Sequence, residues 1–96
     1  MSHGVILRIR DHVRAKTYVV TTHAEEEMDT DELSIFDVES ALLTGQVIAR
    51  QRDGATGERK YVVCGQTVSG TDHAVVVVKF GPTGRLAILT VYAGET

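Results

Sequence analysis

The residues best suited to chemistry in this sequence are a histidine and two carboxylates spaced four apart: His23, Glu27 and Asp31. Residues at this spacing share one face of a helix, so a helix that starts here would align all three. Glu27 could bind one ring nitrogen of His23, fix its tautomer and leave the other nitrogen free as a general base. The alternative is a histidine that only packs or caps at a helix start, and both interpretations stay open.

A metal site is the weaker interpretation of the same three residues. Imidazole and carboxylate groups are competent ligands, but a second histidine or cysteine at zinc-site spacing is missing. Residues 25–39 hold eight of the chain's 13 acidic residues and no Lys or Arg. This run is better explained as a solvated helix face or a surface for a basic partner, so we expect no metal and no cofactor.

Positive charge returns later in the chain, where Arg50 and Arg52 are followed by Arg59 and Lys60. Across a short hairpin these side chains could converge on an RNA phosphate. Two tyrosines could stack on a base or donate a proton: Tyr61 and Tyr92. The alternative is that the cations protect an edge strand against sheet-to-sheet aggregation.

The elements that must position these residues begin with helices. Apolar residues at Val5, Ile9 and Val13 have helical spacing, although the start of this segment also alternates as a strand would. We predict a helix here, followed by the short extended piece "TYVV". Thr22 and Glu25 then form a Thr-x-x-Glu capping box, which predicts a helix from His23.

The next helix has a clearer start. Ser34 and Asp37 have the spacing of an N-cap pair, and Leu33 and Val38 have that of a hydrophobic staple. Gly45 is placed to end this helix. We therefore expect helical structure up to residue 44 and β-structure beyond it.

Four segments after Gly45 read as strands joined by glycine-containing turns: "QVIARQR", "RKYVVCGQTV", "HAVVVVKF" and "LAILTVY". Short connections of this kind favour an antiparallel meander. The predicted fold is α+β, with N-terminal helices packed on a four-stranded antiparallel β-meander.

Both faces of this predicted sheet carry apolar residues. In the third strand Val76 and Val78 point one way, while Val75 and Val77 point the other way, beside Ile88 of the fourth strand. Either the first helix covers the second face or another chain does. A homodimer or a protein partner is therefore expected if the first helix lies elsewhere.

Composition sets the class of molecule. A chain of 96 residues with 43% apolar content is one ordinary globular domain, residues 1–96. It has no apolar run of membrane-spanning length and no signal-peptide pattern at its start, so we expect a cytoplasmic protein without membrane contact. A net charge of -3 argues against a general polyanion binder, and the lone Cys64 is expected to be an inert thiol.

Four motifs occur in an order that resembles a known bacterial family: "YVVTTHAEEEM", "LSIFDVESALLTGQVI", "GERKYVVCG" and "LAILTVY". The family is the domain of unknown function numbered 4258, and the likeness runs from about Tyr18 to Tyr92. Members look like distant relatives of the RelE-like and MqsR-like toxins, which are compact RNA-cleaving proteins. The resemblance also implies a zinc-finger antitoxin of the YgiT or MqsA type as a partner.

One departure from the family pattern affects the candidate site. The commoner pattern has His-Ala followed by arginines at the positions of Glu27 and Asp31, so this chain looks like an acidic variant. Any role that the pattern gives to those arginines is in doubt here.

The resulting functional hypothesis is a toxin-like component of a bacterial toxin–antitoxin pair that acts as a metal-independent endoribonuclease. His23 would be the base oriented by Glu27, Arg50 and Lys60 would hold phosphate, and one of the two tyrosines would contact the base or the leaving group. The alternative, from another class, is a non-catalytic protein-interaction module that binds its partner through the acidic helix face and the sheet.

Overall fold

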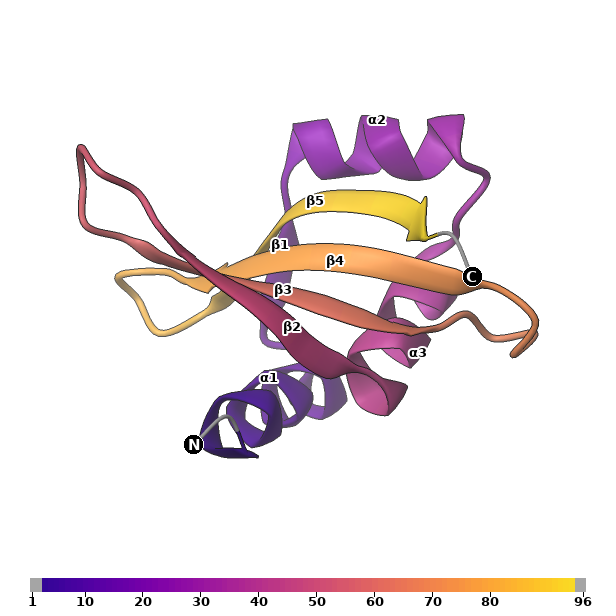
Figure 1. Ribbon diagram of the computed structural model, residues 1–96, viewed down its shortest axis with the longest axis horizontal. Coiled ribbons are helices and arrows are strands. Elements are labelled where there is room, and N and C mark those ends of the chain that lie inside the picture. The colour runs from indigo at the N-terminus through magenta and orange to yellow at the C-terminus, as the bar shows by residue number, and fades with distance from the viewer. Residues whose placement is uncertain (1–2, 95–96) are drawn as a thin grey trace.

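The computed structural model describes residues 3–94 and arranges them as three helices and a five-stranded sheet (Figure 1). The elements in chain order are α1 (His3–Ala15), β1 (Tyr18–Val20), α2 (Thr22–Thr30), α3 (Ile35–Thr44), β2 (Gln46–Arg52), β3 (Arg59–Gln66), β4 (His73–Phe80) and β5 (Leu86–Gly94). The predicted α+β class, with helices first and strands from residue 46, is confirmed.

The predicted four-stranded, wholly antiparallel sheet is wrong. The strand order is β1-β5-β4-β3-β2, and β1 pairs parallel with β5, with Tyr18 opposite Leu86 and Val20 opposite Ile88. The extended piece "TYVV" is therefore a fifth strand. A three-residue strand is too short to show alternation, and its partner lies far along the chain, so local patterns could not reveal the pairing.

The helix starts follow capping chemistry. At α3 the amide of Asp37 donates to Ser34 Oγ at 3.2 Å, and the amide of Ser34 donates to Asp37 Oδ2 at 3.0 Å, which confirms the predicted capping box. At α2 the cap is Thr21, whose hydroxyl oxygen accepts from the amide of Ala24 at 3.2 Å. The predicted box was one residue too late, because two adjacent threonines offer the same hydroxyl.

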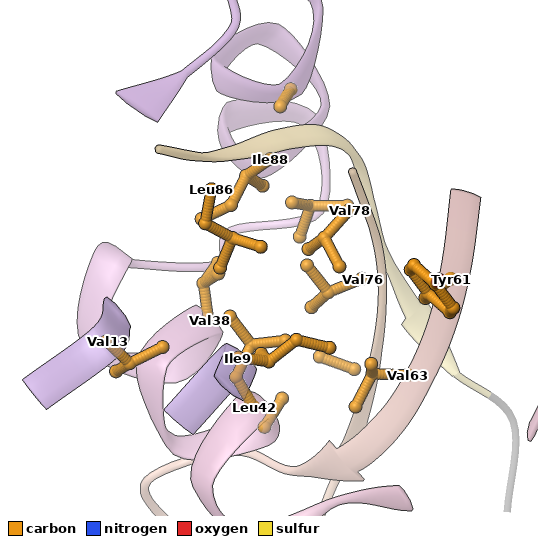
Figure 2. Packing of buried hydrophobic residues seen from close by; sticks show 14 of the residues in the cluster. Ile9, Val13, Val38, Leu42, Tyr61, Val63, Val76, Val78, Leu86 and Ile88 are labelled. Carbon is orange, nitrogen blue, oxygen red and sulfur yellow. The ribbon is translucent and has the colours of Figure 1, made fainter. Parts of the chain in front are cut away.

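The core lies between one face of the sheet and the helices α1 and α3 (Figure 2). Figure 2 shows Ile9 of α1 and Leu42 of α3 pointing toward Val63 and Val76 of the sheet, and all four side chains are fully buried. Residues spaced three or four apart on each helix thus meet the alternate residues of each strand.

The predicted position of Ile88 beside Val77 is wrong. The pairing of β4 with β5 shifts by one residue, so that Val77 lies opposite Thr90 while Val78 lies opposite Ile88. An extra residue in β5 reverses the alternation and turns Ile88 into the core. Because α1 packs on the core face, it does not cover Val75 and Val77, yet Val75 is only 6% exposed and Val77 is half-buried. A homodimer or partner on that face stays a prediction.

The helix layer approaches the sheet most closely at Gly65. A Cβ atom on Gly65 would lie 2.0 Å from the carbonyl oxygen of Ala41 in α3. Both contacting groups belong to regular backbone, so neither can move aside without displacing its element. A residue without a side chain is therefore required where α3 crosses β3.

We predict that Gly65→Ala lowers the free energy of unfolding by at least about 1–3 kcal/mol, the usual cost of overpacking a core. Chemical denaturation monitored by circular dichroism would measure it. Gly54→Ala is the control, because a Cβ atom there meets nothing within 4 Å. Equal midpoints for Gly65→Ala and the wild type would contradict the packing described here.

A buried carboxylate links α3 to the connection between α1 and β1. Glu39 is 9% exposed, and its Oε2 atom accepts from Lys16 Nζ at 2.5 Å and from the Tyr18 hydroxyl at 2.6 Å. Burial opposes ionisation of Glu39, but the hydrogen bonds from Lys16 and Tyr18 outweigh it and lower the Glu39 pKa. The charged carboxylate is thus the centre of this network.

The same network raises the pKa of Tyr18 from 10.0 to about 12, through burial first and then through the hydrogen bond to Glu39 and its charge. Because the folded-state pKa exceeds the unfolded one, the contribution to stability is complete below pH 10 and is lost as the pH rises to about 12. We predict that Tyr18→Phe lowers the free energy of unfolding below pH 10 and makes that free energy fall less steeply above pH 10. Urea denaturation between about pH 8 and 12 measures this, with Tyr92→Phe as the control. An equally steep fall of the unfolding free energy with pH in Tyr18→Phe and the wild type would contradict the prediction.

Candidate functional site

The candidate site residues fall into two groups near opposite edges of the sheet. His23, Glu27 and Tyr92 lie along α2 and β5, whereas Arg50 and Tyr61 lie on β2 and β3. β5 lies two strand spacings from β3 and three from β2, so the distance from β5 to β2 across the sheet is roughly 14 Å. The sequence hypothesis required the start of α2 to lie near the first hairpin, and the structure does not bring them together.

In the first group, the expected contact between His23 and Glu27 is present. His23 Nε2 lies 3.2 Å from Glu27 Oε1, with the histidine side chain 68% exposed and the glutamate 28%. The same Glu27 oxygen accepts from the backbone amide of Val91 at 3.2 Å. Glu27 therefore orients His23 and also binds the edge of β5; the catalytic use of this pair stays a prediction.

Asp31 repeats this contact one helical turn later. Its Oδ2 atom accepts from the amide of Ala93 at 2.8 Å. Pairing with β1 ends at Ile88, and beyond it the Thr21 hydroxyl donates to the carbonyl of Leu89 at 3.3 Å. Side chains of α2 and its two ends thus supply the hydrogen-bond partners that a neighbouring strand would otherwise offer to β5, because the amides at a sheet edge need an acceptor.

His23, Glu27, Asp31 and Tyr92 line one open hollow of about 370 Å³, together with Glu26. None of the described lining residues is Lys or Arg. Three carboxylates in the wall repel a phosphate, so this hollow is poorly suited to hold RNA. Tyr92 lies in the hollow with its side chain 43% exposed.

The second group forms around the hairpin of β2 and β3. Arg50 lies opposite Tyr61, and Arg52 lies opposite Arg59, so the four side chains share one face of the sheet. They line an open hollow of about 320 Å³, and the guanidinium carbon of Arg50 is 5.9 Å from the centre of the Tyr61 ring. The structure therefore brings three of the four expected cations together beside Tyr61, and their convergence on an RNA phosphate stays a prediction.

Lys60 does not share this face. It pairs with Gln51 and alternates with Arg59 and Tyr61 along β3, so its side chain leaves the sheet on the opposite side. The structure thus separates Lys60 from Arg50, the residue with which it was expected to hold phosphate.

Two residues outside the sequence-predicted site extend the second group across the sheet. Arg8 of α1 places its guanidinium carbon 4.1 Å from the centre of the Phe80 ring, and Phe80 meets Tyr61 edge to face at 6.0 Å. The only local signal was Arg8 on the polar face of the first helix. We call this set the arginine-aromatic surface: Arg8, Arg50, Arg52, Arg59, Tyr61 and Phe80.

The guanidinium groups of this surface are not neutralised. All four arginines are exposed, and within residues 3–94 none of them lies within salt-bridge distance of a carboxylate. The nearby Glu58 is bound instead by Lys79 at 2.9 Å. The positive charge of the surface is therefore available to a ligand.

Neither a metal site nor a membrane span is found in the described part of the chain. Within residues 3–94, no group of three His, Cys, Asp or Glu side chains is arranged to hold a metal ion. The helices there are also too short and too polar to cross a bilayer. Cys64 is a free, half-buried thiol on β3.

We predict that Glu27→Ala weakens the closure of the β5 edge, because the amide of Val91 loses its acceptor. The expected cost is about 1 kcal/mol, the low end for an unsatisfied amide since Glu27 is partly exposed. Hydrogen exchange at Val91 should accelerate in Glu27→Ala and stay near the wild-type rate in Glu27→Gln, which keeps an acceptor. Glu26→Ala is the control; equal exchange rates at Val91 in all variants would contradict this role.

Comparison with known protein families gives a match over most of the chain. The family model of the domain of unknown function DUF4258 matches residues 20–93, from the last residue of β1 to the last residue but one of β5. Neither the curated proteins nor the solved structures contain a match. The matched segment excludes α1, so Arg8 lies outside it. Since this match covers most of the chain, the protein belongs to the DUF4258 family.

Proposed function

We propose that this protein is a toxin-like component of a bacterial toxin–antitoxin pair that binds single-stranded RNA and cleaves it without a metal ion. The observation that carries the proposal is the arginine-aromatic surface, where four exposed guanidinium groups without a carboxylate partner in residues 3–94 lie near two aromatic rings. The toxin–antitoxin context rests on the resemblance of the sequence to RelE-like and MqsR-like toxins.

The chemistry of this surface suits a flexible RNA strand. Guanidinium groups bind phosphate oxygens in pairs, and their planes also stack on unpaired bases. Tyr61 is buried and Phe80 half-buried, so the rings serve mainly as platforms that hold Arg50 and Arg8. The exposed guanidinium planes are then the groups that meet the bases and phosphates.

The net charge of -3 does not oppose binding at this place. The acidic residues gather on α2 and the start of α3, while the cations of the arginine-aromatic surface lie at the β2–β3 hairpin and α1. Exposed charges farther apart than about 8–10 Å are largely screened at physiological salt. An RNA strand at the hairpin therefore meets a locally positive field, and α2 disfavours binding at the other edge.

The structure also favours a second candidate function, a protein-interaction module. No helix of the described chain crosses the face of the sheet that carries Val75 and Val77 (Figure 1). Tyr92 lies opposite Val75 on this face and is 43% exposed. A zinc-finger antitoxin or a second copy of the chain could bind to this face. A protein that acts only as an interaction module would not need the arginine-aromatic surface.

We predict that Arg59→Ala weakens binding of a fluorescent single-stranded RNA, whereas Lys60→Ala does not. The two residues are adjacent and carry the same charge, but they lie on opposite faces of β3. Removing one phosphate contact should lower the slope of log affinity against log salt by roughly 0.7. Fluorescence anisotropy over a range of salt concentrations measures both quantities.

Growth of the expressing bacteria extends this test. Expression without a partner should slow growth, and Arg50→Ala with Arg59→Ala should relieve the effect while circular dichroism shows an intact fold. Equal losses of affinity for Arg59→Ala and Lys60→Ala would contradict the assignment of the surface. A wild-type protein that neither binds RNA nor slows growth would leave the protein-interaction module as the function.

A further inference from the structure

We infer that His12 is the general base for RNA cleavage at the arginine-aromatic surface, acting on the 2′-hydroxyl group of a single-stranded RNA. This inference rests on the proposed function and assigns its missing catalytic group. The helical spacing of His23 and Glu27 favours His23 for this role, but His23 lies across the sheet from the arginines, in a hollow walled by carboxylates.

The position of His12 follows from α1. It lies one helical turn after Arg8, so both side chains leave the same face of the helix. Both reach the same aromatic ring: the His12 ring is 5.8 Å from that of Phe80, and the Arg8 guanidinium carbon is 4.1 Å from it. A histidine and an unpaired cation are thus held side by side at one end of the arginine-aromatic surface.

The orientation of the His12 ring is fixed by the end of α1. His12 Nδ1 lies 2.7 Å from the hydroxyl oxygen of Thr17, and the amide of Thr17 donates to the carbonyl oxygen of His12 at 3.0 Å. Either group can donate in this hydrogen bond; in the tautomer that carries its proton on Nδ1, the lone pair of Nε2 is free to accept a proton. Within residues 3–94, no side chain or backbone group hydrogen-bonds to Nε2.

The proposed step is transesterification within the RNA. His12 Nε2 takes the proton of a 2′-hydroxyl, the 2′-oxygen bonds to the adjacent phosphorus, and the bond from phosphorus to the 5′-oxygen breaks. The leaving 5′-oxygen takes a proton from water, and the hydroxide left behind takes the proton from the His12 imidazolium. The products are a 2′,3′-cyclic phosphate and a 5′-hydroxyl, with no change of oxidation state.

The cations have a separate task in this step. Charge builds on the non-bridging oxygens of the phosphorus in the transition state, and a guanidinium beside the base can stabilise it. Arg8 is the nearest candidate, because it shares the Phe80 ring with His12. Arg50 lies farther along the row, over Tyr61, and is placed to hold a neighbouring phosphate.

The experiment compares His12→Gln and His12→Ala with His23→Ala in the full chain, using one labelled single-stranded RNA. Cleavage is followed by gel and mass spectrometry, and affinity by anisotropy with the same RNA carrying 2′-deoxy sugars, which cannot react. We expect the His12 variants to lose cleavage about 100-fold or more, with affinity within about threefold, and both to lose far more cleavage than His23→Ala. Added imidazole should partly restore His12→Ala.

Each other outcome overturns the inference in a distinct way. Loss of cleavage in His23→Ala with normal cleavage in the His12 variants would move the base to α2. Loss of affinity in folded His12→Gln would make His12 a binding residue. A wild-type protein that binds RNA without cleaving it would contradict the role of His12 as a base but not RNA binding at this surface. A wild-type protein that neither binds nor cleaves RNA would contradict the proposed function itself.

Discussion

The close contact between α3 and β3 determines how the rest of the molecule is arranged. Because Gly65 has no side chain, the backbone of Ala41 can lie directly against the strand. This contact brings the apolar face of α3 onto the sheet and fixes the distance from the sheet at which α1 packs beside α3. Arg10 of α1 then binds the end of α3, donating from Nη2 to the carbonyl of Gly45 at 2.8 Å. The position of Arg8 and His12 near Phe80 follows from this helix arrangement.

Local signals predicted the helices well and the sheet incompletely. The Ser34–Asp37 cap and the change of period at Gly45 depend on neighbours within a few residues, so sequence was sufficient for them. The parallel pairing of β1 and the shift in β5 that turns Ile88 inward depend on contacts between distant segments. The candidate site shows the same division. Arg50, Arg52 and Arg59 could be grouped by hairpin alternation, whereas their proximity to Arg8 required the packing of α1.

The acidic residues of α2 gain a structural explanation. Glu27 and Asp31 accept from two amides of β5 that β1 is too short to reach. An arginine at either position has no acceptor to offer, so the acidic pattern of this chain matches its way of closing the sheet edge. His23 is held by the same carboxylate that closes the edge. This bond explains the orientation of His23 without requiring catalysis. The carboxylates of α2 and the arginines of the β2–β3 hairpin give the two sides of the sheet opposite charge.

We propose that single-stranded RNA binds this protein at the arginine-aromatic surface. Titration of the isotopically labelled protein with a short single-stranded RNA, followed by NMR chemical-shift changes, tests it most directly. Binding at this surface should give the largest changes at Arg50, Arg59, Tyr61 and Phe80 and leave α2 unaffected. Changes confined to α2 and the exposed edge of β5, or none at saturating RNA, would contradict it.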